Sequence, residues 1–356
     1  MNPLTQFKKN ESYSFSSHRR WSPLNAFPEL HLSFFPRVIC TCENHQRKNH
    51  MKTITKLIYI AFTVVILAIG AVTANGVPND LFVSINGDGN NGDGSIYQYT
   101  PTGVQSIFAS ALSEPRGMAF GHGGNLFVAN TTFDPGSQTF QATIVKITPG
   151  GVQSTFATLS GNFFGEDVAF DSSGNLFVIA QDQNDPNQAS TIYKFTPRGV
   201  QSTFGSMPGQ GFGLAFDGAG NLFAADAVFQ TIWKFTPDGT RSVFVIASIN
   251  PDQGLVGLAF DRFGNLFVST ESNLVEPDTI LKFTPDGMQS TFAMNLTNPR
   301  GLAFDRSGNL FVSELAPANE ILKFTPNGNQ TLFASGIPTQ PEFLAFWLLP
   351  TPRLTR

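Results

Sequence analysis

The sequence contains few cysteines, few histidines and little charge. Its 356 residues include 2 Cys and 5 His, and charged residues make up 13%. Both cysteines (Cys40 and Cys42) and four of the histidines precede residue 51, so that His122 is the only residue of either type beyond that point. This distribution leaves the rest of the chain without a disulfide, and it argues strongly against a cysteine nucleophile or histidine-based acid–base catalysis there.

The first 74 residues differ in character from the remainder. Residues 1–50 contain no repeat, and we interpret them as a non-native or disordered leader. Met51 begins a short basic stretch that is followed by an apolar run at 57–74, which is typical of a secretory signal peptide. The alternative is a membrane anchor, although 18 residues is short of the roughly 20 that a spanning helix needs. We therefore expect an exported protein (secreted, periplasmic or in the cell envelope) that is membrane-anchored only if 57–74 is retained.

Without this N-terminal segment the chain is acidic. Nine of the 22 basic residues and three of the 26 acidic residues lie before residue 75, which leaves 13 against 23 and a net charge of about −10. Such a charge argues against binding to nucleic acid or to an anionic membrane surface. The ten residues after Phe346, numbers 347–356, are too few to form a membrane anchor.

A repeat dominates the sequence from residue 77 to residue 346. The leucine of a recurring "NLF" or "DLF" motif stands at Leu81, Leu126, Leu176, Leu222, Leu266 and Leu310. A spacing of 44 to 50 residues, built from short runs rich in Phe and β-branched residues, is typical of β-propeller blades. The chain therefore has the sequence pattern of an all-β protein.

One unit, 301–334, shows the expected structure of a blade. It contains four short apolar runs, which predict four strands. An Asp-Arg-Ser-Gly turn that begins at Asp305 follows the first run, and a Thr-Pro-Asn-Gly turn that begins at Thr325 follows the third. In such turns Asp bonds to its own backbone and Gly adopts a positive φ.

The two ends of the repeat region predict how the ring closes. The first copy, which starts at Asp80, lacks the "GLAF" strand, whereas the segment 342–346 is such a strand with no blade after it. Five complete blades and this divided one give a six-bladed propeller of four-stranded blades, closed by a C-terminal strand that completes the N-terminal blade. Closure removes the open sheet edges.

The loops divide between two faces of the predicted ring. The turns after strands one and three are near-identical copies and share what we call the template face. The loops after strands two and four differ from one copy to the next and share the variable-loop face. Examples of these loops are 84–95, 129–143, 180–191 and 269–279. Loops that are free to vary are where binding sites are usually built.

A ring of side chains is expected at the centre of the variable-loop face. The residue just before each "GLAF" strand should point there, and these rim residues are Arg116, Glu166, Phe212, Val256, Arg300 and Glu342. Asn130, Asp226 and Glu314, at the expected ends of second strands, should lie beside them. Such a rim suits a small polar ligand, a sugar or a peptide terminus, with Arg binding carboxylate and Glu binding hydroxyl groups. The alternative is that the Arg and Glu side chains pair with one another.

The blade motif, as in Gly301-Leu-Ala-Phe-Asp-Arg-Ser-Gly-Asn-Leu-Phe-Val, resembles NHL repeats and, more loosely, propellers of the senescence marker protein/gluconolactonase group. The second resemblance implies a metal-dependent hydrolase whose ligands stand at the rim. The segment from Glu166 to Asp171 resembles one ligand context, and counting three and four blades onward gives Arg300 and Glu342. An arginine cannot ligate a divalent metal.

The repeat also resembles the streptogramin lyase propellers, which implies a catalytic histidine. His122 is the only candidate beyond the leader, and it falls in a first-strand turn on the template face, away from the rim. It is therefore interpreted as a solvated turn residue.

A weak calcium motif lies between the first two predicted strands. Asp88, Asn90 and Asp93 alternate with other residues in a glycine-rich stretch, which resembles a calcium loop but lacks its closing Glu. The alternative is a flexible Asn/Gly turn. Possible Ca²⁺ is the only cofactor that the sequence suggests.

Taken together, these features favour a monomeric, exported, non-catalytic propeller that binds a small polar ligand, a sugar or a protein through its variable-loop face. The first alternative is a metal-dependent hydrolase of the gluconolactonase type. The second is a purely structural protein of the envelope or the extracellular space.

Overall fold

The structure of the chain is a computed structural model, and the residues that it describes are 79–87, 92–186, 188–272 and 277–347. All of them belong to one compact unit, Leu67–Arg356. The leader, the apolar run at 57–74 and the tail after Trp347 lie outside the described residues. Over the described ranges no helix is long and apolar enough to cross a membrane.

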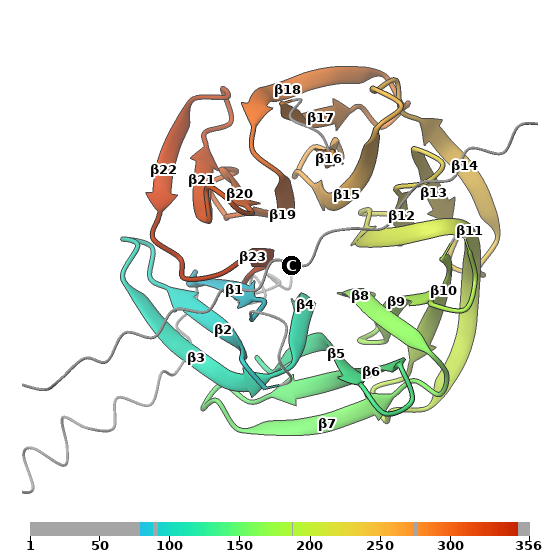
Figure 1. The fold of residues 1–356 in the computed structure, drawn as a ribbon. Coiled ribbons are helices and arrows are strands. Elements are labelled where there is room, and N and C mark those ends of the chain that lie inside the picture. Colours follow the sequence, from blue (N-terminus) through green and yellow to red (C-terminus); the bar gives the residue numbers. More distant parts are fainter. Residues whose placement is uncertain (1–78, 88–91, 187, 273–276, 348–356) are drawn as a thin grey trace, which may run out of the picture. The chain divides into compact units, whose positions relative to one another are not determined.

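The described strands form four four-stranded sheets and one seven-stranded sheet, all antiparallel between neighbours, arranged around a common centre (Figure 1). The first contains β23 (Pro341–Phe346), β1 (Leu81–Ile85), β2 (Gly94–Tyr99) and β3 (Gln105–Leu112). The second contains β4 (Glu114–Phe120), β5 (Leu126–Asp134), β6 (Thr139–Ile147) and β7 (Gln153–Thr158). A third contains β15 (Gln253–Phe260), β16 (Leu266–Ser272), β17 (Asp278–Phe283) and β18 (Gln289–Leu296). A fourth contains β19 (Pro299–Phe304), β20 (Leu310–Glu314), β21 (Glu320–Phe324) and β22 (Gln330–Ala334).

The seven-stranded sheet is held together by one long strand. It contains β8 (Phe163–Phe170), β9 (Leu176–Asp182), β10 (Ala189–Phe195), β11 (Gln201–Phe216), β12 (Leu222–Asp226), β13 (Thr231–Phe235) and β14 (Arg241–Ile246). The first part of β11 pairs with β10 and its last part pairs with β12. This single strand therefore serves as the outer strand next to β8, β9 and β10 and as the inner strand next to β12, β13 and β14. The fold as a whole is an all-β propeller.

The chain closes on itself as the incomplete first and last copies of the repeat predict. The C-terminal strand β23 pairs antiparallel with β1, and Leu81 lies opposite Phe346. Ser84 strengthens this junction, because its hydroxyl accepts a hydrogen bond from the Phe343 amide at 2.9 Å. Pairing of these two strands satisfies a sheet edge that would otherwise be open.

Phenylalanines hold neighbouring sheets together. Phe267 of β16 packs edge-on against Phe292 of its own sheet and against Phe304 of the next, with ring centroids 5.0 Å apart in both cases. The same arrangement joins Phe223 to Phe244 and Phe260. The inner strands of each sheet are buried, whereas the outermost strands are largely exposed. The Phe of each "NLF" motif therefore stabilises the contact between sheets, where edge-to-face pairs are favourable.

The turns of the template face have the predicted geometry. Asp305 accepts hydrogen bonds from the backbone amide of Asn309 at 2.8 Å and from its side-chain amide at 2.7 Å. Gly308 has a φ of 82° and Gly328 a φ of 81°, which favour glycine at these turn positions.

The loops of the variable-loop face are shorter than the sequence predicts, because the strands run further into them. The segment 129–143 is mostly an extended hairpin, in which Asp134 pairs with Thr139. Asn130 was predicted at the end of its strand, and it lies instead within β5. The repeat motif does not predict this extension, because the segments that follow the motif differ from copy to copy.

The inner strands approach one another closely at the centre. A Cβ atom at Gly257 would lie 2.0 Å from the backbone oxygen of Arg300, and one at Gly301 would lie 2.6 Å from that of Glu342. No side chain fits at these distances, which explains why glycine follows the rim residue in most copies of the repeat. This close approach brings the rim residues together.

Candidate functional site

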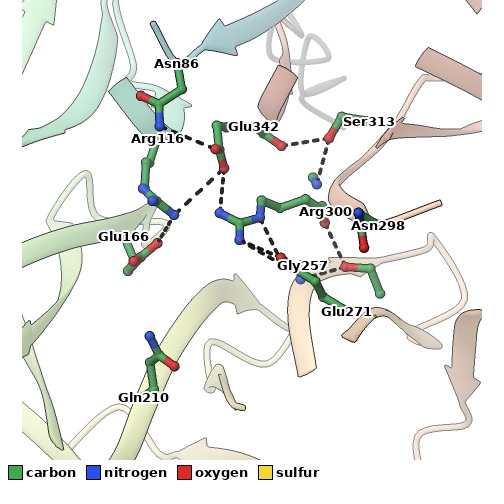
Figure 2. A network of polar contacts seen from close by, with 12 residues as sticks. Asn86, Arg116, Glu166, Gln210, Gly257, Glu271, Asn298, Arg300, Ser313 and Glu342 are labelled. Atoms are coloured by element: carbon green, nitrogen blue, oxygen red, sulfur yellow. Dashed lines mark hydrogen bonds and ion pairs between the residues drawn. The ribbon is translucent and has the colours of Figure 1, made fainter. Parts of the chain in front are cut away.

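Charged rim residues from four inner strands meet at the centre of the ring (Figure 2). Arg116 of β4 lies 3.2 Å from Glu166 of β8 and 3.8 Å from Glu342 of β23. Arg300 of β19 donates to Glu342 at 2.6 Å. The structure therefore brings together all four charged rim residues, and it pairs each arginine with glutamates.

A fifth residue, Glu271 of β16, extends this arrangement. Arg300 donates to Glu271 through Nη2, at 2.8 and 3.1 Å, and through Nε, at 3.2 Å. We call the series Glu166, Arg116, Glu342, Arg300 and Glu271 the ion-pair chain. Sequence reasoning missed Glu271, because it lies beyond the "NLFVS" motif in a segment that the repeat does not define.

Burial and charge set the ionisation of the ion-pair chain. Burial raises the pKa of Glu166 to about 7, although Arg116 and Arg300 oppose this shift. Burial also disfavours ionisation of Glu342, but its two arginine partners outweigh burial and lower the pKa of Glu342. Burial disfavours the charged form of Arg300 as well, yet the Glu342 and Glu271 carboxylates outweigh it and raise the Arg300 pKa. The centre of the chain is therefore firmly ionised, whereas its Glu166 end titrates near neutral pH.

Asp167 is a second buried carboxyl group next to Glu166. It follows its rim residue directly, at a position that glycine holds after four of the six rim residues, and its two oxygens accept hydrogen bonds from the backbone amides of Leu214 at 2.8 Å and Val168 at 2.7 Å. Burial raises its pKa to about 8, against the effect of these hydrogen bonds. The Leu214 bond ties β8 to β11. The exception to the repeat at this position was the only sequence signal for its role.

Serines at the end of the "NLFVS" motif fix the inner strands that carry the rim residues. Ser313 accepts a hydrogen bond from the Gly301 amide at 2.8 Å and donates to the Glu342 backbone oxygen at 2.7 Å. Ser269 makes the same two bonds, at 2.8 and 2.7 Å, to Gly257 and Arg300. Each serine thus joins two inner strands and sets the spacing between their rim residues. The recurring serine was visible in the sequence, but its partners were not.

The other three predicted site residues bind backbone groups of nearby loops and turns. Asn130 accepts from the Ser113 amide at 2.9 Å, and Glu314 accepts from the Thr297 amide at 2.7 Å. Asp226 accepts from the Phe229 amide and from the Trp233 indole, both at 3.1 Å. Burial raises the pKa of Glu314 to about 7, and it also raises the pKa of Asp226. These interactions hold loops and strand ends in place, and the three residues make no direct bond to the ion-pair chain among the contacts of the described part.

The remaining candidates lie away from the rim. Asp88 and Asn90 lie outside the described residues, whereas Asp93 is described and is exposed just before β2. His122 is exposed on a turn of the template face, next to Gly174 of the neighbouring turn. Its position agrees with the interpretation as a turn residue.

An open cleft of about 440 Å³ adjoins one end of the ion-pair chain. The lining residues are Gln210, Phe212, Ala227, Val228, Pro251, Asp252, Gln253, Gly254, Val256, Glu271 and Arg300. The lining thus includes the two apolar rim residues, Phe212 and Val256, as well as the Arg300–Glu271 pair, and the Arg300 guanidinium carbon lies 5.5 Å from the centroid of the Phe212 ring. The rim therefore has a polar part that is internally paired and an apolar part, Phe212 and Val256, that is buried beside this cleft.

The rim residues do not suit a divalent metal ion. The positions that correspond to a gluconolactonase-type site are Glu166, Arg300 and Glu342, and the Arg300 guanidinium lies against the Glu342 carboxylate. Arg116 lies between Glu166 and Glu342. Guanidinium groups already neutralise these carboxylates, and an arginine supplies no lone pair for a metal. Within the described ranges no three His, Cys, Asp or Glu residues form a metal-binding group.

Comparisons with known proteins agree on the fold. The chain is similar to a periplasmic gluconolactonase of Pseudomonas aeruginosa, at 17% identity and a TM-score of 0.55, over 76% of this chain and 86% of that one. It is also similar to a catalytically inactive virginiamycin B lyase of Staphylococcus aureus, solved with quinupristin, at 14% identity and a TM-score of 0.52, over 74% and 95% of the two chains. A Bacteroides caccae protein of unknown function matches at 12% identity and a TM-score of 0.55, over 75% and 98%. No protein-family model and no curated protein matches the chain. At these identities the likeness shows the β-propeller fold alone.

Proposed function

We propose that the chain is an exported β-propeller of six NHL-type blades that binds a small ligand, without catalysing a reaction on it, in the cleft of the variable-loop face. The observation that carries this proposal is the cleft of about 440 Å³ next to an internally paired set of charges. A concave site on a loop-bearing face, with a few charged and polar groups in its lining, is a common place for small molecules to bind.

The count of six blades is supported by the sheet topology. Four sheets of four strands are single blades, and the seven-stranded sheet counts as two blades that share β11. The β11 strand has 16 residues, enough to serve one blade as its fourth strand and the next as its first. The NHL type rests on the recurring blade motif, and export rests on the signal-like segment 51–74.

The pairing of the rim charges supports binding rather than catalysis. Arg300 donates from Nε, Nη1 and Nη2 to two glutamates, so that its charge is already satisfied. Glu342 is 1% exposed and faces both arginines. Groups held in this way are poorly placed to attack a substrate, because a catalytic group needs access to the reacting atom.

The second candidate is a hydrolase, and one observation favours it. Glu166 has a pKa raised to about 7 by burial, and such a carboxyl group can act as an acid or a base near neutral pH. Its side chain is only 3% exposed, however, and lies against Arg116. We therefore rank this candidate below ligand binding.

Blocking the cleft tests the proposed function. Val228 is 49% exposed at the edge of the cleft, so Val228→Trp fills part of the cleft without disturbing the core. Val243→Trp is the matched control, because Val243 is also 49% exposed but lies on the outer strand β14. Thermal shifts of the full chain are measured with a panel of small amines, carboxylates, sugars and short peptides.

The expected result is at least one compound that raises the melting temperature of the full chain and of Val243→Trp, and that has no effect on Val228→Trp. A panel without any stabilising compound would overturn the proposed function. Equal stabilisation of the two variants would do the same, because it would place the ligand elsewhere.

A further inference from the structure

We infer that the cleft takes a ligand with an alkylammonium group, a positively charged amine on an aliphatic chain. This inference rests on the proposed function and names its ligand class. It differs from the sequence expectation that arginines bind a carboxylate, and it follows from the way in which the charges of the cleft are already used.

The described part of the cleft offers no uncommitted positive charge. Arg300 is the one cationic side chain among the described residues that line it. Its guanidinium makes a two-nitrogen contact with Glu271 and a 2.6 Å bond to Glu342, and its side chain is only 9% exposed. An anionic ligand would have to displace one of these carboxylates, which makes a carboxylate or a phosphate a poor ligand.

Negative charge, in contrast, remains accessible. The Glu271 side chain is 23% exposed, and within the described ranges its Oε1 atom accepts a single hydrogen bond, from Arg300, although a carboxylate oxygen can accept two. Asp252 lines the same cleft and is exposed. Both groups can accept hydrogen bonds from an ammonium group, and charge-assisted bonds of this kind are the stronger ones.

The charge balance points in the same direction. The ion-pair chain has three carboxylates and two guanidiniums, and Asp252 adds a fourth carboxylate, so that two negative charges are in excess when all are ionised. The propeller region as a whole is acidic, with 13 basic and 23 acidic residues after residue 74. A cationic ligand is therefore attracted both at the cleft and at longer range.

The lining also offers apolar surface to an aliphatic chain. Val228 is 49% exposed and Pro251 is exposed, whereas Phe212 and Val256 are almost fully buried. The Phe212 ring already faces a cation, since the Arg300 guanidinium carbon lies 5.5 Å from its centroid. An alkyl chain that covers Val228 and Pro251 leaves its terminal ammonium group free to bond to Glu271 or Asp252, which line the same cleft.

Calorimetry on the full chain at pH 8 and low salt tests the inference with three probes of similar size: n-hexylammonium, hexanoate and 1-hexanol. We expect n-hexylammonium to bind at least about tenfold more tightly than the other two, because one charge-assisted bond contributes about that factor. Glu271→Gln should weaken its binding about tenfold, and Asp252→Asn should weaken it several-fold. Asp252→Asn keeps the test valid if Glu271→Gln impairs folding, because Asp252 is exposed and its substitution should leave the fold intact. The control Asp286→Asn removes the same charge from a template-face turn and should have no effect.

A second arm distinguishes the sources of an alkylammonium group. An acetylated and amidated Gly-Gly-Lys-Gly-Gly peptide that binds more tightly than n-hexylammonium assigns the cleft to lysine side chains of a partner protein, and the reverse order assigns it to free amines. Tighter binding of hexanoate or 1-hexanol than of n-hexylammonium overturns the inference. Equal affinity of the Asp252→Asn and Asp286→Asn variants for n-hexylammonium also overturns it. The proposed function survives that outcome if Val228→Trp still abolishes binding of the preferred probe, and it fails if no compound responds to that substitution.

Discussion

The most informative perturbation of the ion-pair chain is Arg300→Leu. Arg300 is buried and is the closest partner of Glu342, which is 1% exposed. Among the described residues, the substitution leaves Glu342 with Arg116, at 3.8 Å, as its one cationic partner and with the 3.5 Å hydrogen bond from Asn86, and it deprives Glu271 of its bidentate partner. Removing one partner of a buried ion pair typically costs about 3–5 kcal/mol, because the remaining charge stays desolvated.

The loss should depend on pH in a defined direction. In the native protein the pKa of Glu342 lies below its unfolded value, so that its contribution to stability is present above the unfolded pKa and is lost as the pH falls through the folded pKa. In the variant burial dominates and the pKa of Glu342 rises above the unfolded value. The stability difference between the two proteins should therefore be largest near pH 8 and should shrink toward pH 5, where the carboxyl group is protonated in the variant.

Urea unfolding of both proteins at pH 5 and pH 8 measures this difference. Adding Glu342→Gln to Arg300→Leu should recover part of the loss at pH 8, because the uncompensated charge is removed. Arg262→Leu, at an exposed turn of the template face, serves as the control and should change stability by no more than about 0.5 kcal/mol. A loss below about 1 kcal/mol, or one that is the same at both pH values, would refute the reasoning.

Three further predictions concern the ring itself. Deleting 341–356 removes β23 and exposes the edge of β1, so the melting temperature should fall sharply; an unchanged thermal melt would refute the closure. Ser313→Ala leaves the Gly301 amide and the Glu342 carbonyl without their shared partner and should cost about 1–3 kcal/mol in urea unfolding; a loss near zero would contradict the bridging role. Asp167 has a folded pKa of about 8, above its unfolded value, so it reduces stability as the pH rises from about 4 to 8; Asp167→Asn should flatten this part of the pH–stability curve, and an unchanged slope would contradict the assignment.

Much of the fold could be predicted from the sequence because the repeat encodes it locally. The recurring Leu of the "NLF" motif marks a buried second strand, and the Asp305 and Gly308 positions mark a turn. The incomplete first and last copies indicate that β23 pairs with β1. Each of these features depends on residues close in sequence or on counting copies of one motif.

The details of the site depend on contacts that the motif does not contain. The four charged rim residues could be predicted to lie near one another, since each precedes a "GLAF" strand. Their order of pairing could not, because the Arg300–Glu342 and Arg300–Glu271 contacts depend on side chains 42 and 29 residues apart. The cleft is lined by residues of β11, β15, β16 and β19 and by the loop segments 227–228 and 251–252, and only the folded arrangement shows that Phe212 and Glu271 line the same space.

The metal content of the purified full chain tests the central claim most directly, namely that the rim is an internally paired set of charges beside a binding cleft. The measurement is elemental mass spectrometry after dialysis without a chelator, on the wild type, Glu166→Gln and Asp88→Asn. The account predicts no stoichiometric divalent ion that depends on Glu166, because Arg116 and Arg300 already neutralise the rim carboxylates. About one ion per chain that is lost in Glu166→Gln but retained in Asp88→Asn would contradict the account and would support a metal-dependent hydrolase.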